Sequence, residues 1–326
     1  MMRIRTKRKW NTLLSKLNAT MGLVRLSHMP MYMMIEPTNY CNLACPLCPT
    51  GNGEIDVPRG YMEYGKFERL ISTMASSLDT LLIWGFGEPL LHPEIFKMVS
   101  FASSVDIKTK ISTNGQCFGG KDKCNALVDS GLTQLRVSLD GLSDKVLQVY
   151  RKGASFELIM EGLSNIIDRK KATHRLTPQI ILQFIAMEHN KHEIPKLTKL
   201  AEKMNIGWRI KTVSIGNKNA ENKEQKIFPD PEKSRYKPMS LCETSEKKPR
   251  VCPYPWFWLH VNWDGTIVPC CKDPHRRHLI GNVFEQNIHD IWNNEAFMAF
   301  RKNYLKDPAK NKRCKKCDLF LGSIKP

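Results

Sequence analysis

Three cysteines lie close together in the first fifth of the chain, in the segment EPTNYCNLACPLCPTG. They are Cys41, Cys45 and Cys48, and they follow an apolar run with the spacing C-x3-C-x2-C. Thiolates bind zinc and iron–sulfur clusters. A cluster of four irons takes one ligand on each iron, so three thiolates leave one iron open to a substrate or cofactor. The spacing therefore predicts an open iron–sulfur site, with structural zinc as the alternative.

A second group of cysteines lies near the end of the chain, at Cys252, Cys270, Cys314 and Cys317. Four thiolates saturate an iron–sulfur cluster or a zinc ion, so this group predicts a closed metal site. Cys271 adjoins Cys270, and the sequence leaves open which of the two is the ligand.

Composition limits the class of protein that holds these sites. The chain has 326 residues, of which 41% are apolar, and this suffices for the core of one barrel with an appendage. We find no apolar run of membrane-spanning length and no secretory signal, so we expect a cytoplasmic protein. That compartment keeps thiols reduced, so the 11 cysteines favour metal or redox chemistry over disulfides.

The elements that must position the first cysteines alternate between strand and helix patterns. Apolar, turn-bounded runs predict strands at 31–36, 80–85, 107–112, 134–139, 179–187 and 208–213. Apolar residues at helical spacing predict helices at 64–77, 92–104, 122–131, 156–171 and 192–205. Such an alternation predicts a parallel sheet, in which functional groups gather in the loops at the carboxyl ends of the strands.

Those loops carry polar motifs in order along the chain. WGFGEPLLHP follows the second strand, ISTNGQ ends the third, and VSLDG ends the fourth. Together with the cysteine motif after the first strand, this series resembles the radical S-adenosylmethionine (radical SAM) superfamily. The resemblance implies an α/β fold built on a partial (β/α)6 barrel. It also implies a 4Fe–4S cluster on Cys41, Cys45 and Cys48 that binds S-adenosylmethionine (SAM) at its open iron.

The resemblance also assigns residues to SAM binding. GFGEP corresponds to the GGEP motif of the family, and the loops after the third and fourth strands supply further polar contacts. The implied cofactor-binding residues are Phe86, Gly87, Glu88, Pro89, Ser112, Asn114, Ser138 and Asp140. Two positions depart from the family pattern, because Phe86 replaces a glycine and Leu47 replaces an aromatic residue.

The C-terminal region resembles the shortened SPASM or "twitch" module of radical SAM enzymes. NWDGTIVPCC fits its β-hairpin, with the turn at Asp264 and Gly265, and residues 281–307 fit its following helix. The resemblance implies a small α+β module that holds an auxiliary 4Fe–4S cluster on Cys252, Cys270, Cys314 and Cys317. We expect packing roles for Cys117 and Cys124.

Charge is unevenly distributed, with a net value of +18 and seven Lys or Arg but no acid in residues 1–30. Trp10, Leu13, Leu14, Leu17, Met21 and Val24 recur there at helical spacing. We expect an amphipathic helix that packs against the main domain, with peripheral membrane contact as the alternative. The predicted organisation is a basic N-terminal segment at 1–30, a radical SAM barrel at 31–213, a polar linker at 214–250 and a SPASM/twitch module at 251–326.

The resemblance implies an enzyme that cleaves SAM reductively to a 5'-deoxyadenosyl radical, which then removes a hydrogen atom from the substrate. We expect oxidation or epimerisation of a small polar or sugar-like molecule, as in a dehydrogenase or epimerase. Cys242 is the candidate hydrogen-atom donor, and a flavodoxin or ferredoxin is the expected reductant. The alternatives are a ribosomal peptide maturase and a non-catalytic, metal-containing nucleic-acid-binding protein, although the chain has no recognised nucleic-acid-binding module.

Overall fold

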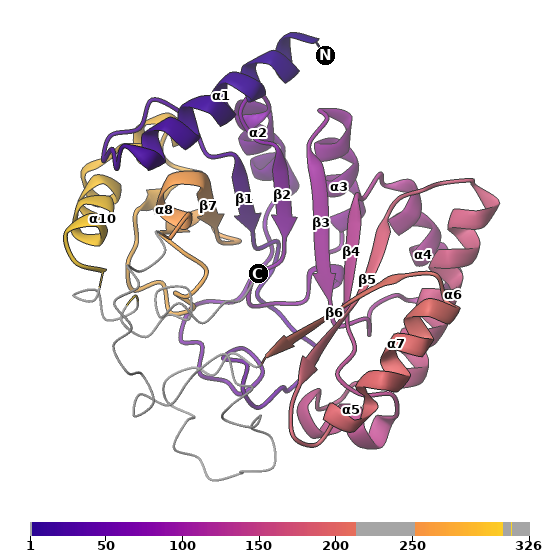
Figure 1. Ribbon diagram of the computed structural model, residues 1–326. Helices are drawn as coiled ribbons and strands as arrows, with labels where there is room; N and C mark the ends of the chain where they lie inside the picture. Colours follow the sequence, from indigo (N-terminus) through magenta and orange to yellow (C-terminus); the bar gives the residue numbers. More distant parts are fainter. Residues whose placement is uncertain (1, 213–251, 309–313, 315–326) are drawn as a thin grey trace.

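The computed structural model describes residues 2–212, 252–308 and 314 (Figure 1). The expected polar linker at 214–250 lies outside the described residues, and so do Cys242 and Cys317. The structure confirms the expected α/β class, with a parallel sheet followed by a smaller C-terminal module.

A nine-stranded sheet organises the molecule, in the order β6-β5-β4-β3-β2-β1-β7-β8-β9. Its first six strands along the chain run parallel to their neighbours, as the alternating pattern predicts. These strands are β1 (Tyr32–Ile35), β2 (Thr80–Ile83), β3 (Lys108–Thr113), β4 (Gln134–Ser138), β5 (Gln179–Ala186) and β6 (Gly207–Thr212). Their carboxyl ends therefore meet at one end of the barrel, which is the lower end in Figure 1.

Helices cover the outer face of the parallel strands (Figure 1). They are α2 (Tyr64–Met74), α3 (Ile95–Ser104), α4 (Gly120–Asp129), α6 (Phe156–Ala172) and α7 (Ile194–Lys203), with the 3-10 turns η1 (Pro89–Leu91) and η2 (Lys191–Glu193). Alternate strand residues such as Ile35, Ile83 and Val137 are fully buried in the core beneath them. Because side chains alternate along a strand, the residues between these positions face the inside of the barrel.

One helix in this region was absent from the expectations. Helix α5 (Asp144–Tyr150) occupies the loop after β4, between Ser143 and Arg151. It has only seven residues, too short for a sustained helical period to appear in the sequence.

The C-terminal module joins the sheet of the barrel. Strand β7 (Trp258–Val261) follows the short helix α8 (Tyr254–Phe257) and pairs in parallel with β1, with Met34 opposite His260. Strands β8 (Thr266–Val268) and β9 (Gly281–Asn282) continue antiparallel. The expected hairpin turn is present, and Gly265 adopts a φ of 85°, which favours glycine.

The expected single helix at 281–307 is wrong. The structure instead has β9 and then two helices, α9 (Ile288–Trp292) and α10 (Glu295–Lys306). Asparagine side chains accept hydrogen bonds from the first turns of both, since Asn287 caps α9 and Asn294 caps α10. Capping residues have non-helical backbone angles, so Asn293 at the end of α9 and Asn294 at the start of α10 separate the two helices.

The N-terminal segment forms helix α1 (Met2–Thr20), which lies at the upper periphery of Figure 1, at the opposite end of the strands from the cysteines. It packs on the main domain as expected, but mainly through polar residues. Of the expected apolar residues, Leu14 and Val24 are half-buried, whereas Trp10, Leu13, Leu17 and Met21 are exposed. In the part of the chain that the structure describes, no helix has the length and apolarity needed to cross a membrane.

Candidate functional site

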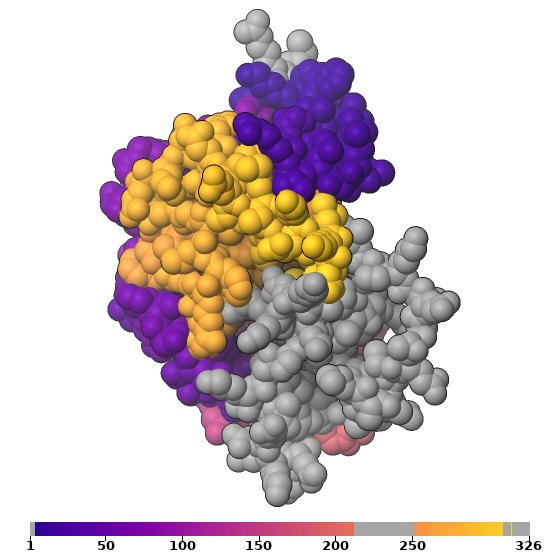
Figure 2. All heavy atoms as spheres, turned by 90° about the vertical axis from the view of Figure 1, so that its left-hand side faces the viewer, coloured from indigo at the N-terminus to yellow at the C-terminus, as the bar shows by residue number. Residues whose placement is uncertain are grey.

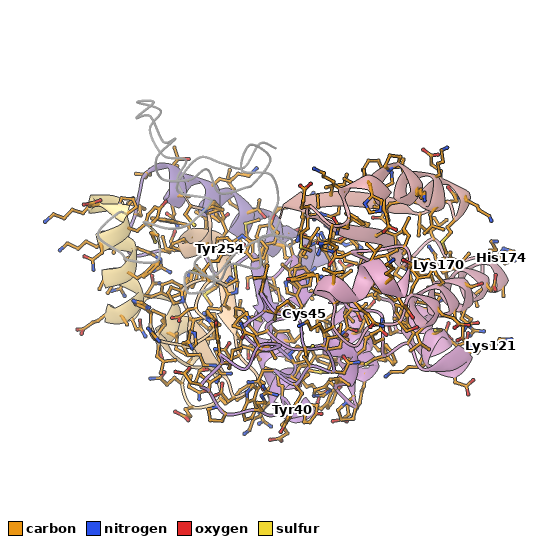
Figure 3. The ribbon with its side chains drawn as sticks, turned by 90° about the horizontal axis from the view of Figure 1, so that it is seen from below. Tyr40, Cys45, Lys121, Lys170, His174 and Tyr254 are labelled. Atoms are coloured by element: carbon orange, nitrogen blue, oxygen red, sulfur yellow. The ribbon has the colours of Figure 1, made fainter. Side chains whose placement is uncertain are left out.

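The loop after β1 holds the three cysteines at the carboxyl end of the strand. Its entry is fixed by Thr38, whose hydroxyl donates to the carbonyl of Gly60 over 2.7 Å. Within the loop, the N–H of Cys48 donates to the carbonyl of Cys45 over 3.1 Å. Figure 3 shows Cys45 in the middle of the molecule. The local backbone therefore brings the expected metal ligands together on one short turn.

The three thiols share one environment. Cys45 is buried, whereas Cys41 and Cys48 are half-buried. The pKa of Cys45 is raised to about 11, mainly by burial and further by the neighbouring thiols of Cys48 and Cys41. A buried thiol such as Cys45 resists ionisation, and the positive charge of a bound metal would stabilise its thiolate form.

This arrangement fits an iron–sulfur cluster. Within residues 2–212, 252–308 and 314, no three His, Cys, Asp or Glu side chains converge as ligands of a single ion. The ligands of a four-iron cluster bind different irons, so they need to be neighbours without converging on one point. Three neighbouring thiols on one loop meet that requirement.

The GFGEP loop after β2 rests directly on the cysteine loop. A Cβ added at Gly87 would lie 2.2 Å from the carbonyl oxygen of Thr38 and 2.7 Å from that of Tyr40. The N–H of Glu88 donates to the Tyr40 carbonyl over 2.8 Å. Only glycine allows this approach, because any side chain would force the two backbones apart.

Glu88 connects the loops after β2 and β3. It is 2% exposed, and its carboxylate accepts hydrogen bonds from the hydroxyl of Thr113 and the N–H of Asn114, both over 2.7 Å. Burial raises the pKa of Glu88. The carboxylate therefore fixes the loop after β3 relative to the loop after β2. Pro89, the next residue, begins η1.

Asn114 reaches the cysteine loop from β3. Its amide donates to the Oδ1 of Asn42 over 2.8 Å and lies 3.9 Å from the sulfur of Cys41. Ser112 and Ser138 lie on the inner faces of β3 and β4, on strands that the register places side by side. The structure thus gathers these residues at one end of the barrel, and their contacts with SAM remain predictions.

A buried ion pair lies beside Cys45. The Nε of Arg151 is 2.6 Å from an oxygen of Asp140, which is fully buried and also accepts the N–H of Ile185 over 2.6 Å. Burial lowers the pKa of Arg151, but Asp140, Tyr150 and Cys45 together raise it by more, so the guanidinium stays charged. The same guanidinium hydrogen-bonds Cys45 and lowers the pKa of that thiol.

Arg151 is one residue of the site that the sequence did not indicate. It follows α5, the helix that was not expected, and no motif surrounds it. Asp140, which was expected to bind the cofactor, also has a structural role, because its carboxylate orients Arg151. A charged guanidinium beside a metal-binding thiol favours the thiolate form.

Glu36 links the barrel to the C-terminal module. It is 4% exposed, and its carboxylate accepts the N–H of Phe86 over 2.8 Å. Arg276 of the module lies 3.4 Å from it and also pairs with Asp264. Burial raises the pKa of Glu36 to about 7.

The inner face of the sheet carries positive charge next to this site, further from the carboxyl ends of β3 and β4. Lys110 and Arg136 lie half-buried on the adjacent strands β3 and β4. Their chain neighbours Ile111 and Leu135 are fully buried in the core under the helices, so Lys110 and Arg136 face the inside of the barrel. The guanidinium of Arg136 lies 5.2 Å from the ring centre of Trp84 and donates to the side chain of Gln134 over 3.0 Å. Burial lowers the pKa of Lys110, and the charge of Arg136 lowers it further.

Gln183 adds an unused polar group to this interior. It is 7% exposed, on β5 next to Ser138, and its side-chain oxygen has no hydrogen-bond partner among the described residues. A buried acceptor without a partner is costly unless a ligand supplies a donor. The inner face therefore suits a ligand with an anionic group and a donor.

The C-terminal cysteines also gather in space. Burial raises the pKa of Cys270, and the neighbouring thiols of Cys271, Cys252 and Cys314 raise it further. The hydroxyl of Tyr254 hydrogen-bonds Cys271. The described part of the chain thus brings three of the four expected ligands together and places Cys271 among them.

The two remaining described cysteines differ in their surroundings. Cys124 is fully buried, and its sulfur faces the carbonyls of Phe118 and Gly162 at 3.8 and 3.7 Å, in agreement with a packing role. Cys117 instead accepts the amide N–H of Asn42 over 3.4 Å, at the border of the cysteine loop.

A separate groove of about 830 Å³ lies at the other end of the barrel. It is bordered by Lys170 and His174 at the end of α6 and by Gln179 and Gly207 at the starts of β5 and β6. Figure 3 shows Lys170 and His174 at the edge of the molecule, away from Cys45. This groove does not belong to the cysteine site.

Comparison with family models gives two matches. Residues 35–181 match the radical SAM superfamily, and residues 252–318 match SPASM, described as an iron–sulfur cluster-binding domain. The first match runs from Ile35, the last residue of β1, to Ile181 in β5, and the second begins at Cys252.

Individual proteins are similar over most of their length. The chain is 23% identical over 310 residues to a tungsten-containing aldehyde ferredoxin oxidoreductase cofactor-modifying protein of Pyrococcus furiosus, covering 84% of this chain and 85% of that one. It is 24% identical over 303 residues to a PqqA peptide cyclase of Rhizobium meliloti, covering 83% and 76%. The crystal structure of BtrN in complex with AdoMet and 2-DOIA has a similar fold, with a TM-score of 0.57 and 18% identity over 90% of this chain and 94% of that one.

Proposed function

We propose that this chain, which belongs to the radical SAM superfamily and carries a C-terminal SPASM domain, modifies a peptide. The enzyme would bind that peptide through one of its acidic groups. Its radical SAM domain binds a 4Fe–4S cluster and SAM, and its SPASM domain binds auxiliary iron–sulfur clusters. When bound, the first cluster and SAM supply the 5'-deoxyadenosyl radical that removes a hydrogen atom from the substrate.

We assign the ligands of the first cluster to Cys41, Cys45 and Cys48, because they are neighbouring thiols at the carboxyl end of β1. Arg151 favours the ionised forms of Cys41 and Cys45. Gly87 and Glu88 keep the loop after β2 in contact with the cysteine loop. Ser112, Asn114 and Ser138 would line the SAM site, with Phe86 and Pro89 supporting it. We assign auxiliary cluster binding to Cys252, Cys270, Cys314 and Cys317.

The Lys110 and Arg136 pair on the inner face of the barrel carries the substrate proposal. Two like charges, half-buried on adjacent strands, repel each other and are partly desolvated. Among the described residues, neither forms an ion pair. An anionic group between them would relieve the repulsion, and the side chain of Arg136 is suited to bind a carboxylate in two places.

Similarity to a PqqA peptide cyclase supports a peptide as the carrier of that carboxylate. A glutamate or aspartate side chain, or a C-terminal carboxylate, would sit on Lys110 and Arg136, while the acceptor oxygen of Gln183 would take a backbone N–H. The peptide carbon next to this anchor would then face the SAM end of the barrel. The comparisons favour this peptide alternative over the small polar or sugar-like substrate expected from the sequence.

The test is substrate-stimulated cleavage of SAM by the anaerobically reconstituted protein. Matched peptide pools that carry Glu and Asp, or Gln and Asn in their place, are added with SAM and a reductant, and 5'-deoxyadenosine and peptide mass are followed. We expect only acidic pools to stimulate cleavage. Arg136→Gln and Lys110→Gln should each weaken the stimulation by about tenfold, the effect of losing one hydrogen bond to a charged group.

Lys199→Gln, at an exposed position on α7, is the matched control and should keep full stimulation. Equal stimulation by the uncharged pools would contradict the acidic-substrate proposal. A phosphorylated sugar that stimulates where no peptide does would support the second candidate, a small anionic metabolite, since phosphate suits the same two cations.

A further inference from the structure

Helix α1 is attached to the protein by its polar face. Arg8, Ser15 and Asn18 are 8%, 0% and 3% exposed. The guanidinium of Arg8 donates to the carbonyl of Ala75 over 2.7 Å and to that of Val105 over 2.8 Å. These hydrogen bonds to backbone carbonyls of the barrel hold the helix in place. An amphipathic surface helix would ordinarily bury its apolar face instead.

The apolar stripe of α1 faces away from the protein. Trp10, Leu13, Leu17 and Met21 are 62%, 57%, 52% and 61% exposed. Their spacing of three and four residues places them along one side of the helix and its C-terminal end. Leu305 of α10 is 41% exposed and extends the stripe past Gly22, where an added Cβ would lie 3.6 Å from its side chain. We call these five large apolar residues the outer stripe.

Positive charges flank the outer stripe. Lys7, Lys9 and Lys16 are exposed, and at 100° per residue Lys7 lies on one side of the stripe and the other two on the opposite side. Residues 1–30 contain no acid. Arg5 is engaged elsewhere, 3.0 Å from Asp106. An apolar stripe with lysines on both sides is the pattern of a helix that lies in a membrane interface.

We propose that the outer stripe of α1 binds the surface of an anionic lipid bilayer. The helix forms a convex ridge at the periphery of the molecule, as Figures 1 and 2 show, and a convex ridge fits a deformable bilayer. Its apolar side chains would enter the acyl boundary, while the flanking lysines meet anionic headgroups. Because α1 lies opposite the cysteine-bearing end of the barrel, this orientation keeps the catalytic end turned away from the membrane.

This inference does not rest on the proposed substrate, and its test uses no substrate. The reconstituted full-length protein is floated with vesicles of phosphatidylcholine alone or mixed with phosphatidylglycerol. We expect binding to the mixed vesicles that weakens as salt is raised. The double substitution Leu13→Asp and Leu17→Asp should reduce binding by at least about tenfold, because both side chains would otherwise be buried in lipid.

Leu176→Asp is the matched control, because Leu176 is 90% exposed and distant from α1 in the sequence. It should float like the unmodified protein, and all variants should keep the same iron content. Trp10 gives a direct readout, since brominated lipids should quench fluorescence in the unmodified protein more than in Trp10→Phe.

Three outcomes would overturn the proposal. The first is no flotation with anionic vesicles at low salt. The second is flotation that the double substitution leaves unchanged, which would assign binding to net charge alone. The third is a dimer in light scattering that the double substitution dissociates, without vesicle binding, which would make a second copy of the chain the partner of the outer stripe.

Discussion

At the residue scale, the two groups of cysteines differ in the charge that surrounds them. Arg151 hydrogen-bonds Cys45, whereas burial and neighbouring thiols raise the pKa of Cys270. A thiolate in the first group is therefore stabilised by protein charge, and one in the second group depends more on the metal. Each group should therefore hold its iron without the other.

Iron content tests this independence. A variant with Cys41, Cys45 and Cys48 all changed to Ala should retain about four irons per chain, held by the SPASM domain. Changing Cys252, Cys270 and Cys314 to Ala should instead leave the first cluster. Iron and acid-labile sulfide are measured after anaerobic reconstitution, with Cys124→Ala as the control that keeps both.

Two outcomes would contradict the expected iron contents. About one zinc and no iron in the first variant would make the C-terminal module structural. An unchanged iron content in the second variant would remove these three cysteines from the ligand set.

At the element scale, the loops after β1, β2 and β3 behave as one unit. Glu88 receives hydrogen bonds from β3 and donates its own N–H to the cysteine loop. Gly87 allows the contact because its Cα approaches the Thr38 carbonyl without a side chain between them. Loss of this contact would move GFGEP away from the cysteines, although each strand would keep its pairing.

We expect Gly87→Ala to lower SAM cleavage by at least about tenfold, because shifts of about 1 Å in a site have larger effects than that. Gly65→Ala in α2 is the control, since its Cβ would meet Glu63 at an ordinary 3.5 Å. The rate of 5'-deoxyadenosine formation is compared for the two variants. Cleavage at the unmodified rate by Gly87→Ala would show that the close approach is not required.

At the scale of the whole molecule, the barrel and the SPASM domain share one sheet and one core. Strand β7 pairs with β1, and the indole N–H of Trp292 donates to the carbonyl of His28 over 2.8 Å. Trp292 is fully buried, with its ring centre 4.8 Å from that of Phe297. Separating the two domains would therefore expose apolar surface on both.

Trp292→Ala should lower the free energy of unfolding by about 3–5 kcal/mol, the cost of a large cavity in a core. Because the core is shared, barrel and module should still unfold together in a single transition. Trp10→Ala, at a position that is 62% exposed, should change the stability by less than about 0.5 kcal/mol. Denaturation followed by circular dichroism and by iron release would reveal two transitions if the domains were independent.

Much of the fold and part of the site follow from the sequence because their signals are local. The cysteine spacing, GFGEP and the strand-ending motifs each lie within about ten residues, and apolar periodicity marks the strands between them. Parallel strands then bring their carboxyl ends together whatever the details of packing. The six strands, the cysteine loop and the position of Asn114 were predictable on this basis.

The tertiary structure alone decided the features that join distant segments. Arg151 reaches Cys45 through a seven-residue helix with no period to detect, and β7 pairs with β1 across more than half of the chain. Periodicity identified the apolar side of α1, but which side faces the protein depends on what lies opposite. Backbone carbonyls at Ala75 and Val105 bind Arg8 there, so the polar side is buried and the apolar stripe is left exposed.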